Sequence, residues 1–254
     1  MVKNFSERIR LYLEGLKERE NLFPITKKMK EPIRTVLDSS IFHGASVSRN
    51  AARGQKEVRL NVDGDRNRAI SYMAWSTGQR EFLPLLLGCY ELLPAGRITR
   101  HREIEWVVLE EPEMGLHPMG TFAVMTLILD LLSRGYKVVV TTHSSHVLDI
   151  VWAIEAIKRQ KIHESQRIGL LAQLLDLPDS GTGILDMLGK ALHLESRTYC
   201  FYYEAGRVRA KDISSLDPGD EDEIVSGWGG LAAYSGRVTD TVAEAVRSAS
   251  LDLT

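Results

Sequence analysis

Two apolar runs in the middle of the sequence end in side chains that can bind a cation or transfer a proton. The run WVVL at 106–109 is followed by Glu110 and Glu111, and the run KVVVTT at 137–142 is followed by His143. A carboxylate pair directly after a buried strand suits phosphate chemistry, because one acid can reach a Mg²⁺ ion while the other orients or deprotonates the attacking water. An isolated pair of glutamates at such a position is more often a solvated strand end, and a lone histidine there is more often structural.

The histidines at this point of the chain do not predict a transition-metal site. His143 and His146 could form a ligand pair, but no third ligand follows at a suitable spacing. We therefore do not expect His143 and His146 to bind a metal.

A third candidate site is the sequence WSTGQRE at 75–81. Ser76, Thr77, Gly78 and Gln79 precede a helical pattern, so they place backbone N–H groups and a hydroxyl at the positive end of a helix. Such a helix end can bind an anion, although the same residues also form an ordinary helix cap.

The elements that would position these groups alternate between strands and helices. The apolar runs are continuous rather than alternating, which predicts a parallel sheet buried on both faces and covered by helices. The fold class is therefore α/β, with a mostly parallel sheet and a β-hairpin near the C-terminus that turns at Ala205-Gly206. A second hairpin is expected around Asp63-Gly64 and a loop over 44–54. Helices are expected over 5–19, up to about 38, over 78–93, after Pro118, from about 145 and from about 231.

The order of these motifs resembles the C-terminal half of an ABC-type ATPase head, in the soluble group that includes OLD-family, RecF-like and SMC-like ATPases. The resemblance rests on STGQ, then EEPE about 30 residues later, then TTH after about 30 more, and it spans about residues 55–155. It implies that Ser76 to Gln79 are the signature motif, which contacts the γ-phosphate of ATP held by the opposite subunit. It further implies roles for residues of the EEPE and TTH segments: Trp106 to Glu110 as the Walker B strand with Glu110 near Mg²⁺, Glu111 as the catalytic glutamate, Gly115 to Pro118 as the D-loop, and His143 as the switch histidine.

The sequence departs from the family pattern in two ways. Glu110 stands where most ABC proteins have Asp, a variant that several OLD-like ATPases share. More importantly, the sequence contains no G-x-x-x-x-G-K-[ST] motif, which a P-loop needs to wrap the phosphates. The nearest string, GILDMLGKA at 183–191, has one residue too many between its glycines and ends in Ala191 where a hydroxyl is required.

The resemblance therefore implies an ATP-binding and ATP-hydrolysing lobe that needs ATP, Mg²⁺ and a P-loop lobe or second ATPase head as partner. We expect it to be inactive alone, to dimerise in its complete form, and to act in DNA maintenance or phage defence. The alternative is a non-catalytic docking or scaffold module derived from such an ATPase. Three regions are expected: a helical segment over 1–54, the ATPase core over 55–160 and a C-terminal α+β extension over 161–254.

Composition supports a soluble cytoplasmic protein without a membrane segment. The 254 residues carry a formal net charge of −2 and are 44% hydrophobic, so there is no overall basic excess for nucleic acid. A local basic patch at 97–102 leaves DNA open as a partner. Two cysteines, Cys89 and Cys200, are expected to be buried free thiols, and the aromatic run at 199–203 is expected to pack in a core.

Overall fold

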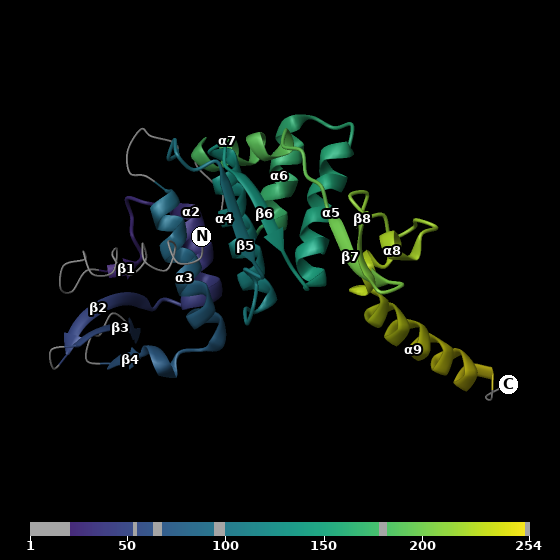
Figure 1. Ribbon diagram of the computed structural model, residues 1–254, viewed down its shortest axis with the longest axis horizontal. Helices are drawn as coiled ribbons and strands as arrows, with labels where there is room; N and C mark the ends of the chain where they lie inside the picture. The colour runs from purple at the N-terminus through teal and green to yellow at the C-terminus, as the bar shows by residue number, and fades with distance from the viewer. Residues whose placement is uncertain (1–20, 53–54, 63–67, 94–99, 178–181, 252–254) are drawn as a thin grey trace. The chain divides into compact units, whose positions relative to one another are not determined.

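The computed structural model describes residues 21–52, 55–62, 68–93, 100–177 and 182–251 (Figure 1). The chain forms two compact units. The first comprises Met1–Thr142 with Gln160–His193, and the second comprises His143–Arg159 with Leu194–Thr254. The helix expected over 5–19 lies outside the described residues, and the predicted three-region division stays a prediction.

The first unit begins with an antiparallel sheet of four strands. In spatial order these are β1 (Asn21–Phe23), β2 (Ser46–Ala52), β3 (Gln55–Asn61) and β4 (Ala69–Ser71). The pairing of β3 with β4 confirms the hairpin predicted there, whereas its turn at Asp63-Gly64 lies outside the described residues.

Strand β2 occupies most of the segment 44–54, for which a loop was the wrong prediction. Its polar composition is accommodated because every residue of β2 has a partner in β3. The buried Asn61 also donates a side-chain hydrogen bond of 2.8 Å to the hydroxyl of the buried Ser48. Cross-strand pairing therefore offsets the burial of these polar groups, which composition alone does not predict.

The parallel part of the unit is the pair β5 (Trp106–Glu110) and β6 (Lys137–Thr141), joined by helix α4 (Pro118–Ser133). The prediction of a mostly parallel sheet holds for this pair only, since the other strand pairs among the described residues are antiparallel. Burial of both faces was also wrong. Along both strands, buried or half-buried residues alternate with exposed ones, so one face of the pair is covered and the other is exposed. Helix α4 packs against β6. The fold is thus mixed α/β.

Helix α4 is the centre of the first unit. It is buried almost all round, as expected for a helix that other elements surround. Three helical elements contact α4 directly (Figure 1): α2 (Glu31–Leu37), the π-helical turn η1 (Asp38–Phe42) and α7 (Thr182–Leu192). Helix α6 (Glu164–Leu174) packs on α7.

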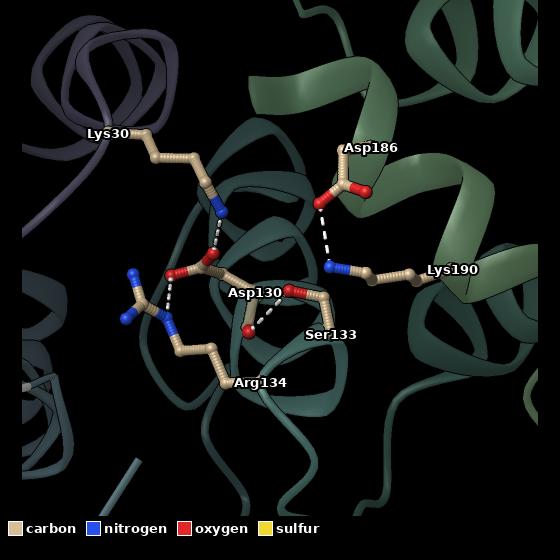
Figure 2. Close-up of polar contacts among 6 residues, drawn as sticks. All are labelled: Lys30, Asp130, Ser133, Arg134, Asp186 and Lys190. Atoms are coloured by element: carbon tan, nitrogen blue, oxygen red, sulfur yellow. Dashed lines mark hydrogen bonds and ion pairs between the residues drawn. The ribbon is translucent and has the colours of Figure 1, made fainter. Parts of the chain in front are cut away.

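A buried ion network fixes α2 against α4 (Figure 2). Asp130 is fully buried in α4, and its two carboxylate oxygens accept hydrogen bonds from Lys30, before α2, and from Arg134, at 3.0 Å. Ser133 donates to the backbone carbonyl of Asp130 at 2.8 Å. Because both partners keep some exposure, the charges are compensated without full desolvation of the two cations.

Helix α3 (Thr77–Leu92) confirms the predicted helix over 78–93. It is preceded by the short 3₁₀ turn η4 (Tyr72–Ala74). Its C-terminal end is tied to the start of β6, because the Tyr136 hydroxyl donates to the carbonyl of Leu92 at 2.7 Å and accepts from the N–H of His101 at 2.9 Å. The Tyr136 hydroxyl therefore bridges the end of α3 and the backbone of His101.

The second unit contains α5 (Ser145–Arg159), the hairpin of β7 (Tyr199–Glu204) and β8 (Arg207–Asp212), the short helix α8 (Glu223–Ser226) and α9 (Ala233–Leu251). This confirms the predicted hairpin and its turn at Ala205-Gly206, where both residues have positive φ. A small core includes Leu148, Ile213, Leu216, Val225 and Trp228.

Three features of the described residues bear on the sequence predictions. None of the described helices is both long and apolar enough to span a membrane. Cys89 and Cys200 are free thiols; Cys89 is buried as predicted, whereas Cys200 is only partly buried. Phe201 and Tyr203 are exposed, so packing in a core was the wrong prediction for the aromatic run at 199–203.

Candidate functional site

The carboxyl end of β5 carries the two acids that the sequence singles out. Glu110 is the last residue of the strand and is exposed, on the same face as Trp106 and Val108. Glu111 follows with φ of +43°, a left-handed conformation that costs a non-glycine residue about 1–2 kcal/mol. Its N–H donates to the carbonyl of Thr141 at the end of β6, at 2.9 Å. Strain of this kind persists only where surrounding contacts hold it, and it is concentrated at functional sites.

A third acid, Glu113, belongs to the same site and was not assigned a role from sequence. One of its carboxylate oxygens accepts a hydrogen bond from the Thr142 hydroxyl, so the residues after β5 and β6 are joined by side chains as well as by backbone. Its other oxygen is buried and has no hydrogen-bond partner among the described residues. The only sequence signal for Glu113 was its place in the EEPE motif, next to Glu110 and Glu111.

The predicted signature residues form the beginning of α3. Ser76 is its N-cap: the Ser76 hydroxyl accepts from the N–H of Gln79, and the Gln79 side chain accepts from the N–H of Ser76, both at 3.2 Å. Gln79 also donates to the carbonyl of Ile41 at 3.0 Å. Ser76 and Thr77 are exposed, whereas Gly78 is buried. The N-terminus of α3 is therefore accessible, and its geometry is fixed by the bonds between Ser76 and Gln79 and by the bond from Gln79 to Ile41.

The start of α3 is packed directly on the loop that follows the acids. A Cβ on Gly78 would lie 2.5 Å from the carbonyl oxygen of Gly115 and 3.0 Å from Leu116. Gly115 itself has φ of +71°, and a Cβ there would lie 3.1 Å from Thr77. Only glycine allows two backbones to come this close. The structure thus brings the predicted signature motif and the predicted D-loop residues together.

The loop ends at the beginning of α4. His117 is the N-cap of that helix, its Nδ1 accepting from the N–H of Met119 at 3.3 Å, and Pro118 occupies the first helical position. Residues 111–117 therefore connect the acids, the α3 contact and the central helix within one short segment.

His143 is the first residue of the second unit and is exposed. It follows Thr142 directly in the chain. Its predicted role stays a prediction. His146 lies 3.6 Å from Asp149 on α5, an exposed pair one helical turn apart.

The carboxylates at the end of β5 can be compared with the ligands that Mg²⁺ requires. Groups of three or more His, Cys, Asp or Glu side chains that could hold a metal are absent from the described part of the chain. Mg²⁺ in nucleotide sites uses one or two carboxylates together with phosphates and water, so one exposed carboxylate, Glu110, fits that requirement. Glu110 would hold the ion, and the ion would neutralise charge on the transferred phosphate.

An uncovered apolar surface leads to Glu110 along the β5–β6 pair. Trp106, Val108 and Val139 are 58%, 63% and 41% exposed on one face. In register, Val108 pairs with Val139 and Glu110 with Thr141, so the apolar rows end at the acid. Lys137 covers part of Trp106, its Nζ lying 5.1 Å from the ring centroid. Parallel strands normally have both faces covered, so this face is available to a further element.

The basic patch predicted between α3 and β5 is described in part. Arg100 donates to the carbonyl of Gly135 at 3.2 Å, and His101 is held by Tyr136. Arg97 lies outside the described residues. These contacts give the Arg100 side chain and the His101 backbone a structural role.

Comparison with known proteins identifies one family. Residues 3–149, more than half of the chain, match the family model described as "AAA domain, putative AbiEii toxin, Type IV TA system". No curated protein matches the sequence significantly. The matched range contains β5, the start of α3 and the loop between the acids and α4.

Proposed function

The chain belongs to this AAA-domain family, and we propose on that premise that it is an ABC-type ATPase lobe that is completed by a P-loop lobe outside these 254 residues. Membership in this family indicates an ATPase-like domain, and such domains generally use a nucleotide and Mg²⁺. The proposal adds which residues act and why a partner is needed.

The observation that carries the proposal is the end of β5. A parallel strand pair with an uncovered apolar face runs into Glu110, and the next residue, Glu111, has a strained backbone that is held by Thr141. A merely solvated strand end requires neither the strain nor the apolar approach. An element that covers this face would bring bound phosphates to the acids.

The proposed chemistry assigns one step to each group. Glu110 would hold Mg²⁺, and the bound ion would neutralise charge on the transferred phosphate. Glu111 accepts a proton from water as the water oxygen bonds to the γ-phosphorus and the bond to the β,γ-bridging oxygen breaks. Ser76, Thr77, Gly78 and Gln79 face the γ-phosphate of ATP held by an opposing head. His143 is proposed as the switch histidine.

The proposed biological setting is defence. The description of the matched family names a toxin of a toxin–antitoxin system, which favours phage defence over DNA maintenance among the two settings expected from sequence. Nucleotide-driven closure and opening of two heads would convert ATP turnover into a mechanical change.

ATP binding by the isolated chain gives a first test. Calorimetry with Mg-ATP should detect little binding, because a P-loop supplies much of the phosphate cradle. A low-micromolar affinity of the isolated chain for Mg-ATP would contradict the need for a partner lobe.

Ser76 variants test the anion site in complete heads, in which the P-loop lobe is present. Ser76→Arg should abolish ATP-dependent dimers, because the long side chain fills the space in front of the helix. Ser76→Ala is the matched control, since it loses the same cap, worth about 0.5–2 kcal/mol, but leaves the space open. ATP-dependent dimers of Ser76→Arg at the level of Ser76→Ala and the wild type, measured by light scattering, would mean that Ser76 is only a helix cap and would contradict the proposed role.

A further inference from the structure

The side chain of Glu113 links the segment after β5 to the end of β6. Its carboxylate accepts a hydrogen bond from the hydroxyl of Thr142, a residue 29 positions away in the chain. Two residues before Glu113, the N–H of Glu111 donates to the carbonyl of Thr141 at 2.9 Å. Two adjacent residues at the end of β6 therefore hold both ends of the segment 111–113, one through the backbone and the other through a side chain.

The segment itself is closed by two backbone turns. The carbonyl of Glu111 accepts from the N–H of Met114, and the carbonyl of Glu113 accepts from the N–H of Leu116, both at 3.0 Å. Pro112, between the two acids, has its φ fixed by its ring. The backbone between Glu111 and Glu113 is therefore stiff, so that a contact made by Glu113 constrains Glu111.

Glu111 needs such a constraint because its backbone is strained. Its φ of +43° is a conformation that a non-glycine residue keeps only where surrounding contacts hold it. Thr141 holds its N–H and Met114 holds its carbonyl, but both of these bonds belong to the strained residue itself. The bond between Glu113 and Thr142 adds a restraint from outside the strained residue.

The surroundings of Glu113 are unfavourable for a residue that serves stability alone. One of its carboxylate oxygens is buried and has no hydrogen-bond partner among the described residues. A buried polar atom without a partner lowers stability. Glu110 and Glu111 are close to it in the chain, and repulsion between like charges adds to this cost. A role in holding the site accounts for a glutamate at this position.

We propose that Glu113 is a positioning residue for the catalytic glutamate. Its bond to Thr142, the Glu113–Thr142 clamp, fixes the turn after β5 against the end of β6 and so keeps Glu111 in the conformation in which its carboxylate faces the attacking water. Glu113 itself contacts neither the water nor the phosphate. The catalytic part of this inference rests on the proposed function, whereas the clamp is a property of the chain alone and is tested there.

Amide hydrogen exchange in the full chain without nucleotide tests the clamp. Glu113→Ala and Thr142→Val each remove the side-chain bond, so the N–H of Glu111 should exchange about tenfold faster or more. The N–H of Lys137 is the matched control. It donates to the carbonyl of Glu105 at 2.9 Å, at the opposite end of the same strand pair, and should exchange at the wild-type rate. Unchanged exchange of the Glu111 amide in both variants would overturn the clamp.

A double variant shows whether the two side chains act through one bond. Glu113→Ala combined with Thr142→Val should speed exchange of the Glu111 amide no more than either substitution alone, because each already breaks the same bond. Additive effects, or an effect of only one single variant, would overturn the clamp. Glu113→Gln keeps an acceptor and Thr142→Ser keeps a hydroxyl, so both should retain most of the wild-type protection. A loss in Glu113→Gln as large as in Glu113→Ala would assign the effect to charge and would also overturn the clamp.

Steady-state ATP hydrolysis by the chain in complex with its P-loop lobe tests the positioning role. Glu113→Ala and Thr142→Val should lower kcat at least about tenfold and leave the KM for ATP unchanged, because Glu111 acts on the water and not in binding. Glu113→Gln and Thr142→Ser should restore most of kcat. Thr126→Val is the matched control. The hydroxyl of Thr126 donates to the carbonyl of Phe122 at 3.0 Å within α4, so this variant loses a bond of the same kind and should keep the wild-type kcat.

The outcomes separate this inference from the proposed function. A wild-type complex that hydrolyses ATP, together with an unchanged kcat in Glu113→Ala, would overturn the positioning role. A higher KM in place of the lower kcat would also overturn it, since Glu113 would then act in binding. A wild-type complex without hydrolysis would contradict the proposed function, and exchange of the Glu111 amide would still decide the clamp.

Discussion

Gly78→Ala changes the close backbone contact between α3 and the loop after the acids. The added Cβ would lie 2.5 Å from the carbonyl oxygen of Gly115, 3.0 Å from Leu116 and 3.1 Å from the carbonyl carbon of Gly115. The first and third of these are backbone atoms, which cannot rotate away as a flexible side chain can. Either α3 or the 111–117 loop must therefore move.

The expected effect is a net loss of stability. Forcing a methyl group into a filled space costs typically about 1–3 kcal/mol. Replacing glycine by alanine in a helix returns at most about 1 kcal/mol, and less in the first turn. The free energy of unfolding should thus fall by about 1–2 kcal/mol, which corresponds to a Tm lower by about 2–8 °C for a chain of this size.

Gly169→Ala is the matched control for this prediction. Gly169 lies in α6, in the same unit, and a Cβ there would meet no atom within 4 Å. Helix propensity alone should then act and raise the free energy of unfolding by about 0.5–1 kcal/mol. The two substitutions should shift a urea or thermal unfolding curve in opposite directions. Stabilisation of Gly78→Ala by as much as Gly169→Ala would refute the close contact of α3 with the loop.

Three further predictions concern stability. Asp130→Ala should lower the free energy of unfolding by about 2–4 kcal/mol in urea titrations, because Lys30 and Arg134 lose a buried partner. Asp186→Ala, which removes the exposed i,i+4 pair with Lys190, should cost at most about 0.5 kcal/mol. Similar losses in the two variants would contradict the role of the network. Glu111→Gly should raise the Tm by relieving the positive φ, a gain of about 0.5–1 kcal/mol that Glu111→Gln should not show. Burial, reinforced by the charge of Asp130, raises the pKa of Cys89 from 9.0 to about 12. Because the unfolded thiol ionises near pH 9.0, the contribution of this group to stability is complete below pH 9.0. It is lost as the pH rises toward 12, by up to about 1.4 kcal/mol per pH unit. Cys89→Ala should therefore lose less stability than the wild type above pH 9.0 in alkaline unfolding titrations, and an identical slope would be evidence against the assignment.

Local sequence signals predicted the elements that carry the candidate site. Helix α3 follows from Ser76 and the apolar periodicity after it, and the parallel pair follows from two continuous apolar runs on either side of α4. These signals are strong because capping and hydrophobic period act within one element.

Predictions failed where the answer depends on what covers a surface. Continuous apolar runs do not reveal whether a second layer is present, so the exposed face with Trp106 and Val108 was not foreseen. The same reason explains the outward position of Phe201 and Tyr203. Likewise, Ser48 is placed in a strand by its cross-strand partners and not by its own propensity.

The close contacts of the site depend on tertiary structure and were also beyond sequence reasoning. Nothing in the spacing of Gly78 and Gly115 indicates that their backbones meet, and the bond between Thr142 and Glu113 joins residues 29 positions apart. Such contacts depend on the path of the chain between the elements.

Single-turnover ATP hydrolysis by the chain in complex with its P-loop lobe tests the central claim most directly. Glu111→Gln should abolish hydrolysis while preserving ATP-dependent association, because the amide keeps the shape of the side chain but cannot take the proton from water. Glu105→Gln is the matched control: Glu105 is an exposed acid immediately before the same strand, paired with Lys137, and its loss should leave the rate unchanged. An unchanged rate in Glu111→Gln, or hydrolysis by the chain without a P-loop lobe, would contradict the account.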